Sequence, residues 1–519
     1  MESIDPALID WSRAQFALTA IYHWLFVPLT LGLSFIVAIM ESRYVRTGDE
    51  FWARTARFWM RLFGINFALG VATGLILEFE FGTNWSNYSW LVGDIFGAPL
   101  AIEGILAFFM ESTFVAVMFF GWNKVGKKFH LASTWLTCLG AAISAWWILV
   151  ANAWMQAPVG VAFNPDTVRH EMMDFFAVAF SPVAVFKFIH SILSGWVLGA
   201  AFVIGVSAWY LLKKRETEFA LKSIRIAAVV GLTAAVLSAW SGDFSGRQLL
   251  ERQPMKLAAV EALYEGGQGT DLSVIGLVNT DKHWRDDAPS LYGGLYLPKG
   301  LSLMATHTPD GYVPGIKDIL EGGYPLPDGS RALSAQEKID RGRRAVQALA
   351  DYRQSQAAGD EAAAVEHRRI LDENMAYFGY GYLDAPEDLI PNVPLNYYAF
   401  RVMVGLGLYF ILFFALVLFL ACRKDLSRYR WLLYVALCTI PLGYLAGQTG
   451  WIVAECGRQP WAIQDVLPVS AAVSDVGAGA VMTTFFLFLA LFSVMLAVGI
   501  SLMVKSVRKG PAMVESLKK

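Results

Sequence analysis

The sequence predicts an all-α polytopic membrane protein, with about nine spanning helices and one large extracytoplasmic lobe between the sixth and the seventh. Three observations lead to this fold class. Of the 519 residues, 56% are apolar and only 17% are charged. The mean hydropathy is +0.45, which water-soluble domains of this length do not show. Apolar segments long enough to cross a membrane recur along most of the chain.

Each spanning helix is predicted from a segment of about 20 apolar residues, the length that crosses a hydrocarbon layer of roughly 30 Å. The first follows "MESIDPALID", which lacks the basic start and cleavage site of a signal peptide, so we expect it to be retained. The sixth is the shortest. The segments are 16–40, 62–81, 96–122, 131–155, 183–212, 224–240, 397–422, 431–453 and 478–504.

Basic residues indicate the orientation of these helices. Lysine and arginine are concentrated after the first, third, fifth, seventh and ninth segments, in "RYVRTGDEFWARTARFWMR", "NKVGKK", "KKRETEFALKSIR", "CRKDLSRYR" and "KSVRKG". Short loops rich in these residues stay in the cytoplasm, whereas long domains are translocated largely regardless of charge. The pattern places the N-terminus and the long loop outside and the C-terminus in the cytoplasm.

The chain divides into three parts. Residues 1–241 carry six helices, residues 242–396 form the outer loop, and residues 397–519 carry three more helices. The loop is too long for a simple connection. Its stretch "SAQEKIDRGRRAVQALADYRQSQAAGDEAAAVEHRRILDENM" is typical of a solvated helical hairpin. The net charge of −2 argues against nucleic acid as a partner, and four cysteines without CxxC spacing suggest neither a disulfide framework nor a zinc site.

Four potential iron ligands are predicted at a similar depth in the outer part of the membrane. His23, His190 and Met403 each lie about six or seven residues from the outer end of their segment, hence roughly 10 Å below the surface. Glu455 follows the outer end of the eighth segment. A single histidine in a membrane helix is more often a packing residue than a ligand, and most methionines fill cores. The joint occurrence favours iron.

The ligand types indicate two kinds of haem. Imidazole and thioether on one iron make a six-coordinate haem suited to electron transfer, whereas a single protein ligand leaves a face open for dioxygen. His190 with Met403 fits the first kind, and His23 and Glu455 fit the second. The alternative for Glu455 is an ion pair with Arg458 at the helix end.

Six motifs extend along the chain in order: "FALTAIYHWLFVPLTLG", "FGINFALGVATGLILEFEFGTNW", "GDIFGAPLAIEG", "WILVANAWMQ", "QPMKLAAVEA" and "GWIVAECGRQPWAI". They resemble subunit I of cytochrome bd-type quinol oxidases. The length of the outer loop resembles the subfamily with an extended quinol-binding loop. The motif positions discussed below all follow the family pattern.

The resemblance implies roles for the haem ligands. His190 and Met403 match the ligands of a low-spin haem b, with Arg401 nearby to offset propionate charge. His23 and Glu455 match the axial ligands of two high-spin haems. We assign His23 to haem d and Glu455 to the second haem b, as in the long-loop relatives, although the family exchanges these positions. The implied complement is two haems b and one haem d.

Two further residues near Glu455 are implied to contact the haem groups. Trp451, one turn earlier, is expected to stack against a macrocycle. Arg458 is expected to pair with a propionate or with Glu455 itself.

The resemblance also identifies quinol-site residues. Lys256 and Glu261 match positions of the quinol loop, where the lysine hydrogen-bonds a quinone oxygen and the glutamate accepts its proton. From their composition alone, these would be surface residues of a polar loop.

A proton route is predicted on the third helix. Glu103 and Glu111 are eight residues apart, about 12 Å along a regular helix, with Glu111 nearer the cytoplasm. Charged residues in a spanning segment mark proton or substrate paths by default. The alternative is two protonated glutamates hydrogen-bonded between helices.

The predicted function is a terminal oxidase subunit in the bacterial inner membrane. It oxidises membrane quinol outside and reduces dioxygen to water with cytoplasmic protons, so no pump is required. The resemblance implies a second large membrane subunit and a small single-helix subunit as partners. The alternatives are a haem b quinol dehydrogenase, which needs only His190 and Met403, and a transporter or channel subunit. The sequence does not choose between ubiquinol and menaquinol.

Overall fold

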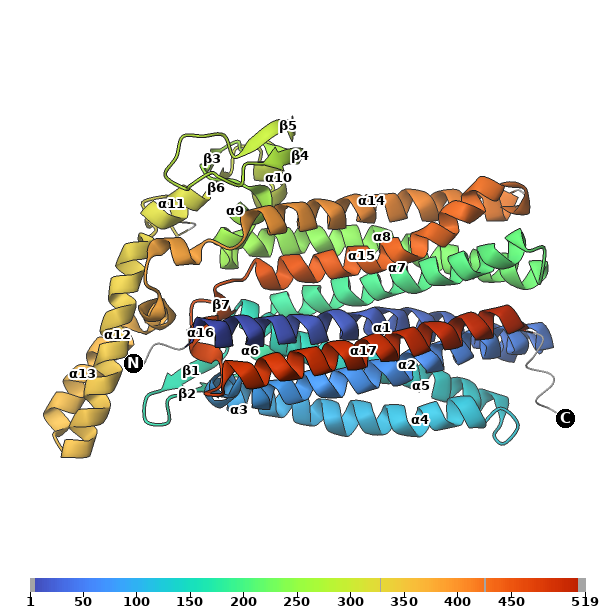
Figure 1. The fold of residues 1–519 in the computed structure, drawn as a ribbon, viewed down its shortest axis with the longest axis horizontal. Coiled ribbons are helices and arrows are strands. Elements are labelled where there is room, and N and C mark those ends of the chain that lie inside the picture. Colours follow the sequence, from blue (N-terminus) through green and yellow to red (C-terminus); the bar gives the residue numbers. More distant parts are fainter. Residues whose placement is uncertain (1–4, 327, 424–425, 512–519) are drawn as a thin grey trace.

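The computed structural model describes residues 5–326, 328–423 and 426–511. Within these ranges, nine helical segments are long and apolar enough to span a membrane. They run side by side in one elongated bundle, and the polar lobe covers one end of it (Figure 1). The predicted all-α membrane fold is confirmed.

The spanning helices are longer than their apolar cores. Asp5 caps the first by accepting a hydrogen bond from the Ala7 amide, and Gly48, at φ 73°, ends it in the left-handed conformation. The spans are α1 (Pro6–Thr47), α2 (Glu50–Thr83), α3 (Ser86–Ile102) with a π-helix (Glu103–Phe108) and α4 (Phe109–Phe120), α5 (Lys127–Gln156), α6 (Phe175–Ala179) with α7 (Pro182–Leu212), α8 (Thr217–Arg252), α14 (Val393–Arg423), α15 (Arg430–Cys456) and α17 (Ala478–Lys509).

The sixth span is longer than the sequence predicts. It was expected to be the shortest, at 224–240, yet α8 has 36 residues. Its polar final turns, "SGDFSGRQLLER", continue the helix beyond the apolar stretch, because hydropathy detects the hydrocarbon-facing part of a helix and not its hydrogen-bonded ends. Helix α8 therefore continues to Arg252, past residue 242 where the predicted loop starts, and α14 begins at Val393, before the predicted residue 397.

The outer lobe combines short strands with a helical hairpin. The charged stretch forms α12 (Ala335–Ala358) and α13 (Glu361–Asn374), where Ser334 and Glu337 make a capping box and Gly359 ends α12. The remaining elements are α9 (Pro254–Glu261), β3 (Gly267–Gln268), β4 (Leu272–Val278), β5 (Leu291–Leu297), α10 (Gly300–Thr306), β6 (Tyr312–Val313), α11 (Ile316–Glu321) and two 3-10 helices (Met375–Tyr382 and Pro386–Leu389). β3 pairs with β6 and β4 with β5, all antiparallel.

Short elements from other connections lie at the same end of the bundle as the lobe (Figure 1). A hairpin of β1 (Val161–Asn164) and β2 (Arg169–Met172) joins α5 to α6. Between α15 and α17 lie β7 (Trp461–Ile463), β8 (Leu467–Pro468) and α16 (Val469–Ala472). At the opposite end, a 3-10 helix (Leu426–Arg428) joins α14 to α15.

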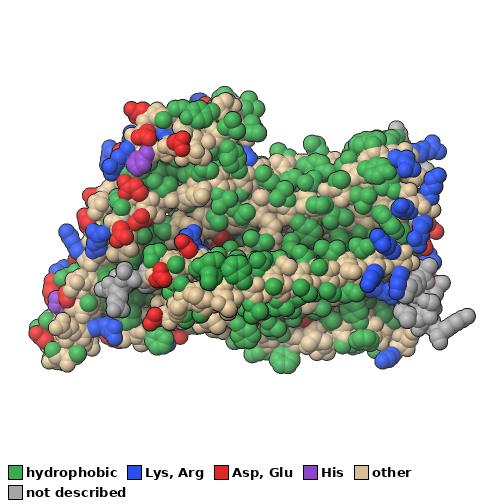
Figure 2. Space-filling model, viewed as in Figure 1, with side chains coloured by type: hydrophobic (Ala, Val, Ile, Leu, Met, Phe, Trp, Pro, Cys, Tyr) green, Lys and Arg blue, Asp and Glu red, His purple; other side chains and the backbone are tan. Residues whose placement is uncertain are grey.

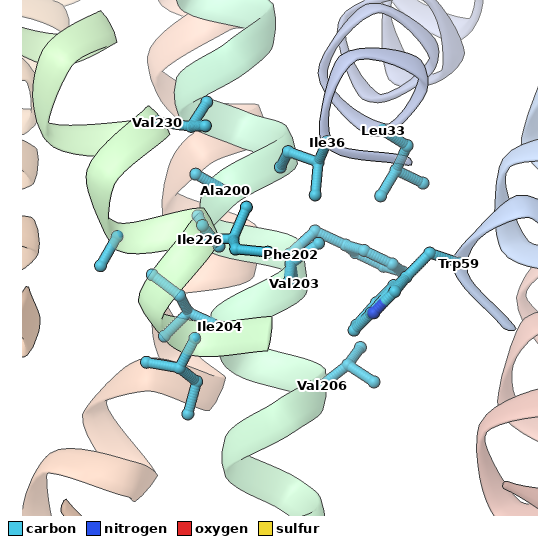
Figure 3. Packing of buried hydrophobic residues seen from close by; sticks show 14 of the residues in the cluster. Leu33, Ile36, Trp59, Ala200, Phe202, Val203, Ile204, Val206, Ile226 and Val230 are labelled. Atoms are coloured by element: carbon cyan, nitrogen blue, oxygen red, sulfur yellow. The ribbon is translucent and has the colours of Figure 1, made fainter. Parts of the chain in front are cut away.

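The largest apolar core lies among α1, α2, α7, α8, α14 and α15, and Figure 3 shows part of it. Trp59 of α2 is fully buried there and donates a hydrogen bond to the Ser223 hydroxyl at 3.2 Å. Glycines allow α1 and α7 to approach closely, since a Cβ on Gly32 would lie 2.3 Å from the Gly195 carbonyl oxygen. This tight packing fixes the positions of the helices that carry the histidines.

The surface has the character of a membrane protein. Figure 2 shows hydrophobic side chains along the flank of the bundle and lysine and arginine gathered at the end opposite the lobe. The outward faces of α14 and α17 carry large exposed apolar side chains such as Leu412 (71%) and Val494 (62%). Such faces are suited to lipid or to another membrane subunit.

Candidate haem and quinol site

Four helices form a closed ring that contains two of the predicted ligands. α7 packs on α8, α8 on α14, α14 on α15, and α15 returns to α7. His190 lies on α7 and Met403 on α14, so residues more than two hundred positions apart belong to one group of helices.

The His190 ring is held through one nitrogen. Nδ1 lies 3.1 Å from the Ser238 carbonyl oxygen and 3.0 Å from the Ser241 hydroxyl, both on α8. A carbonyl oxygen only accepts hydrogen bonds, so the contact favours a proton on Nδ1. Nε2 then keeps its lone pair, as a metal-binding histidine requires.

Met403 lies beside a glycine of the neighbouring helix. Its Sδ is 3.2 Å from the position that a Cβ would take on Gly450 of α15. A larger side chain at this glycine would displace the thioether, so the sequence leaves space for Met403 at this position.

His23 of α1 is held against α2 in a similar way. Its Nδ1 is 3.1 Å from the Thr73 hydroxyl, and its Cε1 is 2.9 Å from the position that a Cβ would take on Gly74. The hydrogen bond fixes the ring through Nδ1 and leaves Nε2 for a ligand.

Two tryptophans connect the surroundings of His23 with those of Glu455. Trp24, next to His23, meets Trp451 edge-on with ring centroids 4.9 Å apart. Trp451 lies one helical turn before Glu455 on α15, and the Lys187 ammonium is 5.6 Å from its ring centroid. The structure thereby brings the first and the eighth spans together at the predicted high-spin haem region.

The prediction that Glu455 follows the end of its helix is wrong. Glu455 lies in the last turn of α15, which continues to Cys456. The helix is longer than predicted because polar residues extend it beyond the apolar segment. Glu455 Oε2 is 2.6 Å from Arg458 Nη2, so the ion pair weighed as the alternative is present. Its Oε1 accepts from the Asn152 amide at 3.0 Å. Lys187 in turn donates to the Asn152 side-chain oxygen Oδ1.

The surroundings of Glu455 contain several basic side chains. Lys256 donates to Gln156 Oε1 at 2.7 Å, and the Gln156 amide reaches Glu455 Oε1 at 3.4 Å. With Lys187 and Arg458, three basic side chains therefore surround this carboxylate. Arg458 is 6% exposed, and its Nε and Nη1 have no hydrogen-bond partner in the described part of the chain. Buried unpaired donors of this kind fit anionic groups such as propionates.

The quinol-loop residues are buried, contrary to the expectation from composition. α9 folds back beneath the lobe, which leaves Lys256 4% and Glu261 3% exposed. Burial lowers the pKa of Lys256 well below its ordinary value. A cavity of about 80 Å³ beside Lys256 is lined by Arg458, Tyr380 and Asp465, among others.

Lys256 and Glu261 have different neighbours. Glu261 Oε2 lies 2.6 Å from Arg401 Nη2. Arg401 also donates to the Ser273 carbonyl oxygen at 2.6 Å and to the Val260 carbonyl oxygen. Burial raises the pKa of Glu261 to about 7, although the Arg401 guanidinium opposes the rise. The arginine expected near a propionate is therefore engaged with the quinol loop.

The two glutamates of the third span both face α5. Glu103 accepts from the Ser144 hydroxyl at 2.6 Å, and Glu111 Cγ is 2.9 Å from the position that a Cβ would take on Gly140. Glu103 begins the π-helix, so the regular α-helical spacing assumed from the sequence does not hold here. Both side chains are buried, at 6% and 7% exposed.

Sequence reasoning assigned no role to several residues of the site. Asn152 and Gln156 lie in the quoted motif "WILVANAWMQ", and Lys187 lies three residues before His190. Their polar character within apolar spans was the available signal. The sequence offered no such signal for Trp24, because aromatic residues are common in membrane-spanning helices.

Comparison with known proteins shows the family of this chain. The family model described as cytochrome bd terminal oxidase subunit I matches residues 11–511. The chain belongs to this family. It is 42% identical over 511 residues to the cytochrome bd-II ubiquinol oxidase subunit 1 of Escherichia coli (strain K12), with 98% of each chain covered.

A second relative is the cytochrome bd ubiquinol oxidase subunit 1 of Bacillus subtilis (strain 168). It is 36% identical over 501 residues, which cover 96% of this chain and 93% of the relative. The solved structure of the bd oxidase from Geobacillus thermodenitrificans matches with a TM-score of 0.77 over 98% of this chain and 100% of that chain. At 24% identity, this match shows the fold.

Family membership confirms the resemblance inferred from the motifs. The chain is a subunit of a haem-containing terminal oxidase and a multi-pass inner-membrane protein. The interpretations as a transporter subunit or as a dehydrogenase are set aside. The relatives are named as subunit 1, which implies further subunits.

Proposed function

We propose that the chain is the haem- and quinol-binding subunit of a quinol:dioxygen oxidoreductase that oxidises quinol at the outer face and reduces dioxygen with cytoplasmic protons, without pumping. The observation that carries this is the family match over residues 11–511, together with the histidine, methionine and glutamate side chains that lie on membrane-spanning helices. The ubiquinol oxidase names of the relatives support a quinol substrate.

His190 and Met403 would hold the low-spin haem b within the ring of α7, α8, α14 and α15. The contact of His190 Nδ1 with the Ser238 carbonyl supports this, because it orients Nε2 as the iron ligand. The space beside Gly450 supports the thioether as the second ligand.

His23 would hold haem d and Glu455 the second, high-spin haem b. In these positions the haems supply electron transfer and a site for dioxygen. Lys187 and Arg458 would offset propionate charge, which the basic side chains around Glu455 support. Trp451 would pack against a macrocycle and, with Trp24, exclude water between α1 and α15.

Glu261 and Lys256 would act on quinol from opposite ends of α9. With its pKa near 7, Glu261 is suited to accept a quinol proton at neutral pH. Arg401 would position this carboxylate through their 2.6 Å contact. Lys256, whose pKa is lowered by burial, would hydrogen-bond a quinone oxygen.

Glu111 and Glu103 would pass protons inward from the cytoplasm. The lysine- and arginine-rich end of the bundle would be the cytoplasmic end, and its charge supports a position of the lobe outside (Figure 2). Glu111 lies nearer that end, and Glu103 nearer the haem ligands. Protons consumed from one side and released on the other would store energy without a pump.

A second large membrane subunit and a small single-helix subunit would complete the enzyme. The exposed apolar faces of α14 and α17 offer surfaces for such helices. The decisive experiment is a reduced-minus-oxidised spectrum of the purified enzyme. Low-spin b, high-spin b and a far-red chlorin band are expected. A spectrum with low-spin b alone would contradict the proposed function.

A further inference from the structure

Glu41 and His130 form a buried pair that has no role in the sites above. His130 Nδ1 lies 2.7 Å from Glu41 Oε1, and the two side chains are 3% and 1% exposed. Glu41 lies in the last two turns of α1, and His130 lies in the first turn of α5. The pair is therefore at the end of the bundle that is rich in lysine and arginine (Figure 2).

The contacts of this pair determine how many protons it holds. His130 Nε2 is 3.1 Å from the Met118 carbonyl oxygen, which only accepts, so Nε2 carries a hydrogen. The 2.7 Å contact of Nδ1 with Glu41 needs a second hydrogen between nitrogen and oxygen, because two lone pairs would repel at that distance. The pair shares one proton and has zero net charge, either as imidazolium with carboxylate or as two neutral groups.

The second oxygen of Glu41 leads into the protein. Thr134 donates to Glu41 Oε2 at 2.6 Å. Thr134 and Thr137, both on α5, are 0% exposed. Buried hydroxyls in an apolar span are costly unless they are hydrogen-bonded, and hydroxyls can both donate and accept a proton.

The same helix meets the proposed proton carriers further along. Gly140 faces Glu111, and Ser144 donates to Glu103 at 2.6 Å. From His130 to Gly140 the helix rises about 15 Å, so a proton route along it would need hydroxyls and internal waters to bridge the interval. A polar stripe on α5 thus extends from the pair toward both glutamates.

An aromatic ring separates the pair from the charged surface. The Trp122 ring lies 4.1 Å from the His130 ring, centroid to centroid, and the Arg57 guanidinium carbon is 4.4 Å from the Trp122 ring centroid. At the same end of the bundle, Lys127 and Glu50 form an exposed ion pair at 3.9 Å. Trp122 is itself partly exposed, so water reaches the ring that lies against His130.

We propose that Glu41 and His130 form the first proton-holding station on the route to Glu111, an inference that rests on the proposed function. When one proton leaves inward past Thr134, a carboxylate remains beside a neutral imidazole. The lone pairs of His130 Nδ1 and Glu41 Oε1 then face and repel each other. This repulsion favours binding of a replacement proton from cytoplasmic water. Only O–H and N–H bonds change, and the charge of the pair goes from zero to minus one and back.

The test uses the complete oxidase with its haems, reconstituted in vesicles. Proton uptake during a single turnover with dioxygen is measured for Glu41→Gln, which keeps the shape of the side chain but cannot relay a proton. Ser42→Ala is the matched control, because Ser42 accepts a hydrogen bond from Trp135 at 3.0 Å and so joins the same two helices without an ionisable group. Resting haem spectra and melting temperatures are recorded for each variant.

Glu41→Gln is expected to slow the proton-uptake phase at least roughly tenfold while the haem bands remain, and the control is expected to stay near the wild-type rate. Equal, small effects in both variants would make the pair a structural tie between helices and overturn the inference. Should Glu41→Gln fail to assemble, Thr134→Val decides in its place: slowed uptake supports the relay, and wild-type uptake overturns it.

The same measurement on Glu111→Gln separates this inference from the proposed function. A slow Glu111→Gln with a wild-type Glu41→Gln rejects only the entry station. Wild-type rates in both reject the route along α4 and α5 altogether.

Discussion

Arg401 Nη2 lies 2.6 Å from Glu261 Oε2, an ion pair that joins the seventh span to the outer lobe. Arg401 is also bound to the Val260 and Ser273 carbonyl oxygens, so it clamps α9 and β4 against the outer end of α14. The contact holds one carboxylate of the proposed quinol loop against the helix that carries Met403.

This contact predicts a pH dependence of quinol oxidation. Burial raises the pKa of Glu261 to about 7, so below that pH the carboxyl is protonated and cannot accept a proton. We expect the rate to rise with pH through about 7, as ionisation frees the base. Glu261→Gln should lower the rate by roughly tenfold or more and flatten this rise. A variant that keeps the wild-type profile would assign the ionisation to another group.

Lys256→Ala should oxidise quinol slowly yet still turn over with an artificial donor that bypasses the quinol site. The physical reason is that the buried lysine is proposed to bind a quinone oxygen and to take no part in dioxygen reduction. The control is Lys299→Ala, an exposed lysine of the same lobe that pairs with Asp310. Equal losses with both donors would argue against a quinol role for Lys256.

Substitutions of the low-spin ligands should have distinct spectral effects. His190→Ala is expected to remove the low-spin haem b, and Met403→Leu to lower its potential or make it five-coordinate, because leucine offers no lone pair. Met40→Leu, in the packed core of α1, serves as the control methionine. An unaltered low-spin spectrum in both ligand variants would refute the assignment.

Substitutions of Glu455 and of Glu111 are expected to impair the enzyme in different ways. Glu455→Ala should perturb or remove high-spin haem in the resting enzyme, because it would remove the proposed haem ligand and because Arg458 loses its counter-charge. Glu111→Gln should keep every haem band but slow the proton-coupled steps after dioxygen binds by roughly tenfold or more. Glu103→Gln is expected to give a mixed result. Haem spectra and single-turnover kinetics are measured for Glu455→Ala and Glu111→Gln. A full haem complement in Glu455→Ala and a wild-type rate in Glu111→Gln would contradict the mechanism.

Several properties of the protein could be predicted from the sequence alone. The hydrocarbon layer excludes unpaired polar groups, so the spans and the rare polar residues within them are visible in local composition. His23, His190, Met403, Glu103 and Glu111 stood out for this reason. Their spans were found with the correct order, although polar ends made the helices longer than their apolar segments, most clearly in α8.

The tertiary structure decided which distant segments meet. No local sequence pattern predicts that α9 folds back under the lobe. Lys256 and Glu261 were therefore predicted to be surface residues, although they are buried. The ring of α7, α8, α14 and α15 and the basic side chains around Glu455 likewise depend on packing between segments far apart in the sequence. Composition records how costly a polar residue is in the membrane, whereas only the packed helices determine which partner offsets that cost.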